Sequence, residues 1–309
     1  MRTLLCLFAA LSLYGQVAFD VKPDRVGIQI NGKPFGTLHY GVEAHKPFLH
    51  PLLTPSGKAV TRGFPVDPQP GDPTDHPHQR GLWVGFEQVN DGKVTIDFWE
   101  NDPSYQRPHM GRIEWKDLTS AVNGASQGAL SMVANWVAPD GSTVIVEHRK
   151  MVFYAEPADC RMFDVELDLE AVRNIVFQDQ DDGLIGMRLN PRFDEKSGGL
   201  VVNAEGAMHE AGVRGHRSPW IDWTTDLGGE KIGVAVFDHP SNFNSPTRWH
   251  LRSFGFLDAN PIAQHEFNNA APDGSHAFKK GERLLMRYRI LIHPAGVNVG
   301  DAYKAFAAK

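Results

Sequence analysis

The stretch MFDVELDLEA, residues 162–171, alternates apolar and acidic side chains over its length. Phe163, Val165, Leu167 and Leu169 form the apolar set, and every residue between them is aspartate or glutamate. Side chains two residues apart point to the same face of a β-strand. The alternation therefore predicts a strand with one face in a core and the other in water, which is typical of antiparallel sheets.

Similar strand patterns recur along the chain and are separated by turn residues. They predict strands at residues 25–30, 129–137, 144–153, 231–237 and 283–292. Asn31-Gly32 follows the first of these, and Pro139-Asp140-Gly141 separates the second from the third, as expected for hairpins. One good helix is predicted, over residues 299–309. We therefore predict an all-β fold, a large antiparallel β-sandwich, formed by residues 19–309 as one domain with a short C-terminal helix.

Residues 1–18 have the pattern of a secretory signal peptide. Met1-Arg2 carries positive charge, residues 4–13 are apolar, and small or polar residues follow from Gly15 to Ala18. An apolar segment of that length is too short to span a bilayer. We expect cleavage between about Gly15 and Phe19 and a location in the bacterial periplasm or outside the cell, with a retained N-terminal anchor as the alternative. The mature chain would keep one cysteine, Cys160, which excludes an internal disulfide.

The charge and hydropathy of the chain exclude several classes of partner. The formal net charge is −6 and no basic stripe is present, so we expect no nucleic-acid partner. The same balance gives no polybasic patch for a membrane surface. After residue 20, no apolar run approaches the roughly 18 residues of a membrane span.

Titratable side chains gather in TDHPHQRGLW, residues 74–83, where an apolar strand begins. Pro77 biases His76 toward extended backbone, so His76 and His78 are expected to project side by side, with Arg80 on the same side. A proline-rich loop precedes them, and loops on rigid sheets commonly carry sites. The alternative is that the cluster caps the strand and bonds the loop. The candidate catalytic residues are His76, His78 and Arg80, and the candidate substrate-binding residues are Asp75, Gln79 and Trp83.

Two further polar clusters stand in the second half of the chain. FDHPSN at residues 237–242 and RWHLR at residues 248–252 bracket a loop, and a wet sheet face with one anchored loop is the alternative interpretation. Between residues 214 and 223, tryptophans stand near arginine and histidine, which suits stacking on a sugar as well as anchoring a strand edge. The candidate catalytic residues of these clusters are Asp238, His239, His250 and Arg252. The candidate binding residues are Arg214, His216, Trp220, Trp223, Asn242 and Trp249.

Three segments together resemble a known family. They are PFLHPLLTPSGKAVTRGFPVDPQPGDPTDHPHQRGLWVGF at residues 47–86, SPWIDW at residues 218–223 and VFDHPSNFNSPTRWHLRSFGFLDANP at residues 236–261. In these segments the chain is similar to the bacterial family often labelled PmoA, after a methane oxygenase subunit. A true subunit of that oxygenase would need several apolar spans of about 20 residues, which this chain lacks. The resemblance implies instead a secreted protein of glycan-degrading bacteria, with a β-sandwich similar to the galactose-mutarotase supersandwich.

The first of these motifs departs from the family at one position. The family usually reads His-Pro-His-His-Arg-Gly, and Gln79 stands here in place of the third histidine. A His-x-His pair offers two metal ligands, and no third can be assigned from spacing. We therefore expect no cofactor and no tightly bound transition metal.

The leading hypothesis is a periplasmic or secreted carbohydrate-active enzyme, a lyase, hydrolase or epimerase of a glycoside or keto-glycoside. His76 or His78 would act as general acid or base, since imidazole titrates near neutral pH. Arg80 and Arg252 would stabilise an oxyanion or enolate, and Asp238 would orient His239 or His250. The two segments would then meet in one pocket that takes a carbohydrate small molecule or oligosaccharide. The alternatives are a non-catalytic glycan-binding β-sandwich and a metal-dependent hydrolase or oxygenase.

Overall fold

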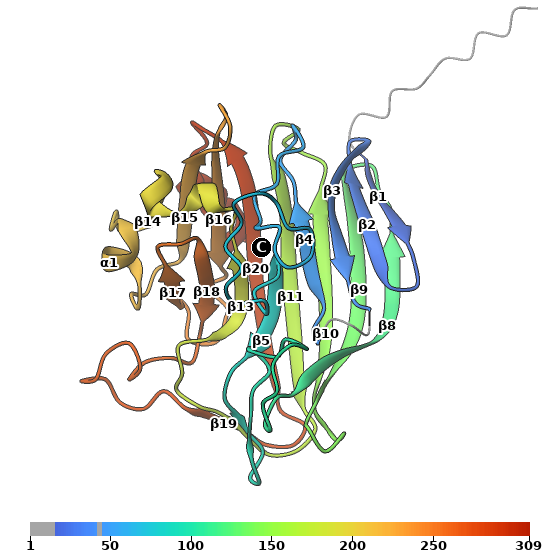
Figure 1. Ribbon diagram of the computed structural model, residues 1–309, viewed down its shortest axis with the longest axis vertical. Helices are drawn as coiled ribbons and strands as arrows, with labels where there is room; N and C mark the ends of the chain where they lie inside the picture. Colours follow the sequence, from blue (N-terminus) through green and yellow to red (C-terminus); the bar gives the residue numbers. More distant parts are fainter. Residues whose placement is uncertain (1–15, 42–44) are drawn as a thin grey trace, which may run out of the picture.

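The computed structural model describes residues 16–41 and 45–309, so most of the predicted signal peptide lies outside the described residues. Two eight-stranded sheets lie over one another, and a small third sheet stands at one end of the sandwich (Figure 1). Paired strands within the three sheets run antiparallel. The predicted all-β sandwich is confirmed.

The strands follow one another across each sheet in an order that mixes near and distant parts of the chain. The first sheet contains, in spatial order, β1 (Val17–Val21), β2 (Arg25–Ile30), β3 (Lys33–His39), β4 (Phe48–Leu52), β5 (Leu82–Phe86), β13 (Gly183–Arg188), β18 (Phe256–Asn260) and β17 (Arg248–Arg252). The second contains β14 (Leu200–Asn203), β15 (Trp220–Asp226), β16 (Lys231–Asp238), β20 (Arg283–Pro294), β11 (Arg161–Ala171), β10 (Thr143–Tyr154), β9 (Gln127–Val137) and β8 (Arg112–Val122). The small sheet contains β19 (His276–Phe278), β12 (Ile175–Phe177), β6 (Val89–Asn90) and β7 (Thr95–Ile96).

The period-two pattern of β11 has the predicted consequence. Its apolar side chains are buried and its acidic side chains are half-exposed in strict alternation. Phe163 meets Phe35 of the first sheet at 5.6 Å between ring centroids, and Phe153 of β10 meets the same ring at 5.9 Å. Edge-to-face aromatic contacts of this kind add to the burial energy that holds the two sheets together.

The turn after β2 uses the residues that the sequence offers. Asn31 and Gly32 have φ values of 55° and 72°, which suits the two-residue hairpin predicted between β2 and β3. At this same end of β2, Val17 of β1 is fully buried and pairs with Ile30. The folded sandwich therefore begins before the predicted domain boundary at residue 19, because β1 needs Val17 and Ala18.

Helices are few and short in the described part of the chain. The predicted C-terminal helix is α2 (Val299–Ala307), and α1 (His209–Val213) and the 3₁₀ turns η1 (Pro191–Phe193) and η2 (Glu195–Ser197) were not predicted. Phe306 of α2 packs on Phe237 of the second sheet at 6.1 Å. None of the helices described has the length and apolar composition that crossing a membrane requires.

Candidate active site

A row of residues across four strands of the first sheet supports the candidate site. Trp83, Gly186, Asp258 and His250 are direct neighbours on β5, β13, β18 and β17. Gly186 must lack a side chain, because a Cβ there would lie 2.5 Å from Trp99 and 2.7 Å from Trp83. The two tryptophan rings, 5.1 Å apart, therefore pack directly over β13. This layer fixes the strands from which Asp258 and His250 project.

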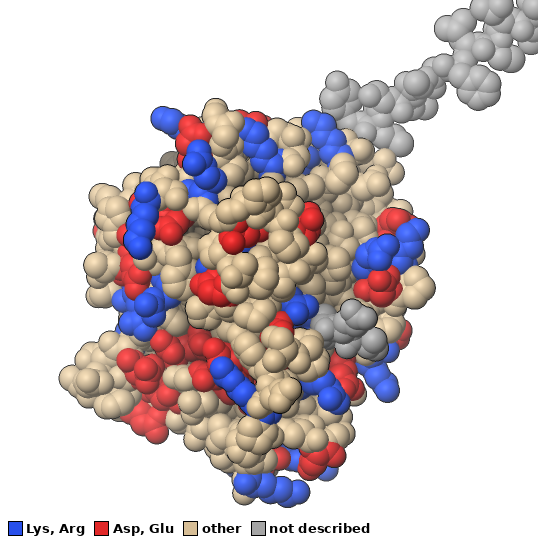
Figure 2. Space-filling model, in the orientation of Figure 1, with Lys and Arg blue, Asp and Glu red and all other residues tan. Residues whose placement is uncertain are grey.

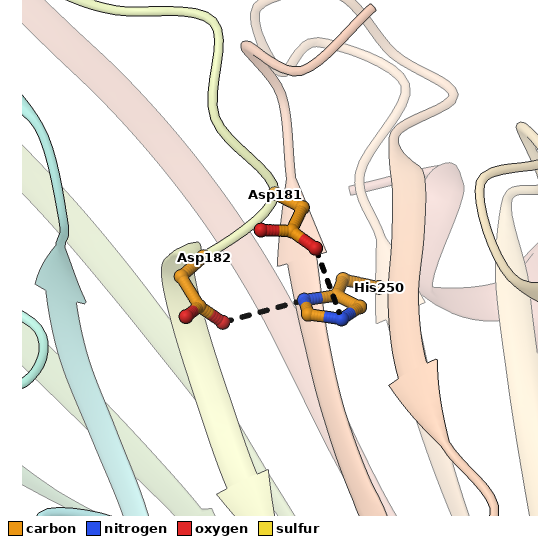
Figure 3. Close-up of side chains that lie close together, drawn as sticks. All are labelled: Asp181, Asp182 and His250. Atoms are coloured by element: carbon orange, nitrogen blue, oxygen red, sulfur yellow. Dashed lines mark ion pairs between the residues drawn. The ribbon is translucent and has the colours of Figure 1, made fainter. Parts of the chain in front are cut away.

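His250 lies among three carboxyl groups. Its Nε2 is 3.4 Å from Asp181, and its Nδ1 is 3.3 Å from both Asp182 and Asp258. Figure 3 shows Asp181 and Asp182, which immediately precede β13, reaching the imidazole from two sides. The side chains of these two aspartates are 21% and 22% exposed, whereas Asp258 is fully buried, so solvent reaches the cluster from one side. Arg214 donates to Asp181 at 2.9 Å.

The protonation of this cluster follows from burial and mutual attraction. Burial alone would lower the pKa of His250, but the Asp182 and Asp258 carboxyls outweigh it and raise that pKa to about 10. Burial raises the pKa of Asp258 well above its usual range, and it raises the pKa of Asp182 as well, while His250 opposes both shifts. One imidazolium does not balance three carboxylates, so the cluster favours either bound protons or a further cation.

A second acidic group adjoins the first, and we call Glu87, Asp97 and Glu100 the acidic triad. One carboxylate oxygen from each lies within 4.8 Å of the others. Asp97 is fixed by the backbone N–H groups of Trp99 and Glu100, and Glu100 forms an ion pair with Arg107. Burial, followed by the charges of Asp182 and Asp97, raises the pKa of Glu87 to about 7. Figure 2 shows acidic side chains gathered on this face of the molecule, below the ends of β17 and β18.

The segment after the triad leads back to His78. The Nδ1 of this buried imidazole lies 3.1 Å from the hydroxyl of Tyr105, which is half-buried. Burial, together with the charge of Lys46, holds the pKa of His78 far below its ordinary value. Burial and the charges of Glu100 and Asp102 raise the pKa of the Tyr105 phenol. The Arg107 guanidinium lies 4.9 Å from the centre of the Tyr105 ring, so one arginine contacts both Tyr105 and Glu100.

Asp75 and Gln79 hold the loop rather than face a ligand. Asp75 accepts from Arg62 at 2.6 Å and from Arg188 at 3.1 Å, and Arg188 also donates to the side-chain oxygen of Gln79 at 2.5 Å. The expectation of extended backbone at His76 is wrong, because its φ is 45° and the loop turns there. The rings of His76 and His78 still lie side by side, 5.6 Å apart.

Aromatic packing connects this loop with the β17–β18 hairpin. His76 stacks on Phe254 at 5.9 Å, Phe254 lies 6.5 Å from Phe256, and Phe256 meets His250 at 5.1 Å. The 74–83 segment and the strand that carries His250 therefore share one face of the molecule despite their separation in sequence. Arg80, on that same face, is bound to Asp102 at 2.5 Å.

The remaining candidates of the second cluster have other contacts. Asp238 accepts from Asn242 at 2.7 Å and from the backbone N–H of Thr247 at 2.9 Å, which closes the loop after β16. His239 bonds Ser241 at 2.6 Å within the same loop. Arg252 is half-exposed and pairs with Glu210 at 3.1 Å. Of these candidates, His250 is linked to the 74–83 segment through Phe256 and Phe254, while Asp238, His239 and Asn242 organise a loop.

The third cluster divides in the same way. Arg214 reaches the candidate site through Asp181, whereas His216 is exposed and bonds the Arg214 carbonyl. Trp220 packs in the cluster under α2 on the second sheet. The other three tryptophans predicted to bind substrate are fully buried in the core. The prediction is therefore wrong for Trp83, Trp223 and Trp249.

Several residues of the site escaped the sequence interpretation. Asp181 and Asp182 stand in DQDDG at residues 179–183, immediately before a buried strand, and this run was a usable signal. The acidic triad, Lys46 and Tyr105 are spread over 60 residues, and only the fold brings them together. Two adjacent aspartates before an apolar strand indicate a candidate site as strongly as the two histidines before β5.

Comparison with known proteins identifies the family of the chain. The chain is similar to the GalM/aldose epimerase homologue from C. elegans, with 10% identity, a TM-score of 0.37 and coverage of 91% of this chain and 100% of that chain. It is also similar to a candidate aldose 1-epimerase from Escherichia coli K12, with 8% identity, a TM-score of 0.39 and the same coverages. No curated protein matches the sequence. The model of a family of unknown function, DUF6807, matches residues 25–307, and the chain therefore belongs to that family.

Proposed function

We propose that the protein is an exported carbohydrate-active enzyme that abstracts a proton beside the carbonyl of a keto-glycoside, and then acts as a lyase or epimerase. The observation that carries the proposal is that Arg107 contacts both the Tyr105 ring and the Glu100 carboxylate at a solvent-accessible surface. An acid (Tyr105), a base (Glu100) and a fixed positive charge (Arg107) therefore lie together. The kinship with the PmoA-labelled family and the export of the chain remain parts of this proposal.

Each of these groups has a distinct role. Glu100, oriented by Arg107, takes the proton from the sugar carbon. The electron pair moves to the carbonyl oxygen, where Tyr105 donates a hydrogen bond and Arg107 supplies positive charge to the enolate. The enolate then expels the glycosidic oxygen in a lyase, or regains a proton on the other face in an epimerase.

His78 serves in this scheme as a positioning residue. Its buried, neutral imidazole, as the Nδ1–H tautomer, donates to the Tyr105 hydroxyl oxygen, which holds the phenol in place and leaves its proton for the substrate. This role differs from the general acid or base expected from the sequence, because burial beside Lys46 disfavours a charged imidazole.

A carbohydrate suits the surroundings of these groups. Tyr105, Phe254 and Phe267 are half-buried aromatic rings near these groups. Polar side chains next to them offer many donors and acceptors for hydroxyl groups. The acidic residues of the same face disfavour a polyanionic substrate through charge repulsion.

The test is a screen of the mature protein against glycosides and 3-keto-glycosides in D₂O. Tyr105→Phe is expected to lower kcat/KM about 10²–10³-fold, and Glu100→Gln about 10²–10⁴-fold with loss of deuterium incorporation at the sugar carbon. Tyr154→Phe and Glu166→Gln, matched changes on the second sheet, should leave turnover within about threefold. Hydrolysis without deuterium incorporation, unaffected turnover in Tyr105→Phe and Glu100→Gln, or glycan binding without turnover would each refute the proposal.

A further inference from the structure

The cluster around His250 has the composition of a metal site. One ligand atom each from Asp181, Asp182 and His250 lies within 4.8 Å of the other two. The two aspartates stand next to each other at the start of β13, and His250 reaches them from β17. Both aspartates are partly exposed, so an ion could enter from solvent without rearrangement of the sheet.

A second observation points to a ligand at the same place. Asp258 is fully buried, and neither of its carboxylate oxygens has a hydrogen-bond partner. Neither ring nitrogen of His250 has one either, although the side chain is only 6% exposed. Buried polar atoms are nearly always satisfied in folded proteins, because an unpaired one has lost its hydrogen bonds to water without replacement. Asp258 and Nδ1 lie 3.3 Å apart and can satisfy each other, which leaves Nε2 as the buried atom that calls for a further partner.

The charges of the cluster support a cation as that partner. Three carboxyl groups surround His250, and Arg214 adds one further positive charge at Asp181. The acidic triad lies beyond Asp182 and brings three carboxyls against one arginine, Arg107. An excess of carboxylates at a partly buried position attracts a divalent ion.

We propose that Asp181, Asp182 and His250 bind one divalent first-row metal ion of the Mn²⁺ or Zn²⁺ kind, with Asp258 as the group that holds the imidazole. Asp258 and Asp182 both lie 3.3 Å from Nδ1. With Asp258 accepting the Nδ1 proton, the carboxylate of Asp182 would turn to the ion, and the lone pair of Nε2 would bind it. Carboxylates that support ligating histidines in this way are a regular feature of metal sites. A mixed set of imidazole and carboxylate suits Mn²⁺ or Zn²⁺ better than Ca²⁺ or Mg²⁺, which prefer oxygen alone.

This site differs from the one considered in the sequence. Among the residues that the structure describes, the sets of three possible ligands within 4.8 Å are this cluster and the acidic triad, and neither includes His76 or His78. Cation binding also does not depend on the proposed reaction, because its ligands are not the groups assigned to proton transfer. The expectation that no transition metal is bound rested on Gln79 and on the lack of a third ligand for His76 and His78, and it did not consider Asp181 and Asp182.

The experiment uses the mature protein stripped with a chelator and titrated with MnCl₂, followed by the electron paramagnetic resonance of free Mn²⁺, and with ZnCl₂ by calorimetry. Wild type should bind one ion per chain and, at about 100 times the dissociation constant, gain roughly 5 °C or more in Tm. Asp181→Asn with Asp182→Asn should weaken binding at least 100-fold. Asp258→Asn should keep the stoichiometry and weaken binding about 10–100-fold.

Two controls separate the site from general acidity. Asp164→Asn with Glu166→Gln removes equal charge from the second sheet and should leave the affinity unchanged. Glu87→Gln should also keep the ion, because it alters the triad and none of the proposed ligands. Stripped wild type that binds neither ion, unchanged binding in Asp181→Asn with Asp182→Asn when near-UV circular dichroism shows a native fold, or binding that is lost only in Glu87→Gln would each overturn the proposal.

Discussion

Lys46 provides a quantitative test of the electrostatics behind the candidate site. The side chain is 3% exposed, and its Nζ donates to the backbone oxygen of Trp99 and, at 2.7 Å, to Asn101. Burial lowers its pKa from 10.5 to about 7, although Asp97 opposes the shift. The ammonium form is therefore costly in the folded state and free of that cost in the unfolded chain.

The sign of the pH dependence follows from proton binding. Above about pH 7 the folded protein has released the Lys46 proton, while the unfolded chain keeps it up to about pH 10.5. Lys46 thus lowers the free energy of unfolding most at pH 6 and progressively less as the pH rises. The full effect is on the order of 5 kcal/mol, of which roughly 2–3 kcal/mol is recovered between pH 6 and pH 9.

Lys46→Met removes this dependence. The assay is urea denaturation of wild type and variant at pH 6 and pH 9, with chelator present in all samples. The free energy of unfolding of wild type minus that of the variant should rise by roughly 2–3 kcal/mol from the lower to the higher pH. Hydrogen bonds lost in the variant cancel, because they contribute nearly equally at both values. Lys116→Met, at an exposed lysine, serves as the control and should show no such rise. A rise below about 1 kcal/mol in Lys46→Met would refute the reasoning.

Three further predictions concern the fold and its export. Glu147 and Arg149 form a fully buried ion pair at 2.6 Å. Glu147→Gln should therefore lower the free energy of unfolding, measured by denaturation, by about 3–5 kcal/mol, and Glu147→Leu with Arg149→Met should recover most of this loss. A loss below about 1 kcal/mol for the single change would contradict the prediction. Gly186→Ala should destabilise by about 1–3 kcal/mol or more, because its Cβ would lie 2.5 Å from Trp99, and unchanged stability would show that the tryptophan layer yields easily. Protein purified from the periplasm should begin at Gln16 or Val17 by mass spectrometry, since β1 needs Val17, and an intact Met1 or a start at Ala18 or later would refute this.

The sequence predicted β2, β9, β10, β11, β16 and β20 well because their signal is local. The alternation in residues 162–171 and the Asn31-Gly32 turn each fix a strand or hairpin without reference to distant residues. Side-chain exposure is different, since it depends on what packs above the strand. The sequence suggested Trp83 and Trp249 as substrate-binding residues. In the fold, Trp99 packs on Trp83, and the indole N–H of Trp249 donates to the backbone carbonyl of Ser218. The alternation of apolar and polar residues alone does not predict which side chains are buried by segments distant in sequence.

The candidate site shows the same division between local and long-range information. Histidines attract attention in a sequence because they titrate near neutral pH, and three of the candidates at the 74–83 segment and at His250 do lie on one face. Their roles, however, are set by neighbours from other strands. His78 is neutralised by burial, whereas the same ring type at position 250 gains three carboxyl neighbours. Identical side chains thus receive opposite charge preferences from the fold.

The clustering of acidic residues indicates that this end of the sandwich is not optimised for stability. Six carboxyl groups, those of Glu87, Asp97, Glu100, Asp181, Asp182 and Asp258, gather where His250, Arg107, Arg214 and Lys46 supply the positive charge. Burying like charges together opposes folding, and apolar residues of similar size would stabilise the same strands better. The buried Lys46 adds a further cost of the same kind. The core around Phe35, Phe153 and Phe163 stabilises the fold enough to offset these buried charges. The unfavourable charges are therefore concentrated where a substrate or a metal ion would neutralise them.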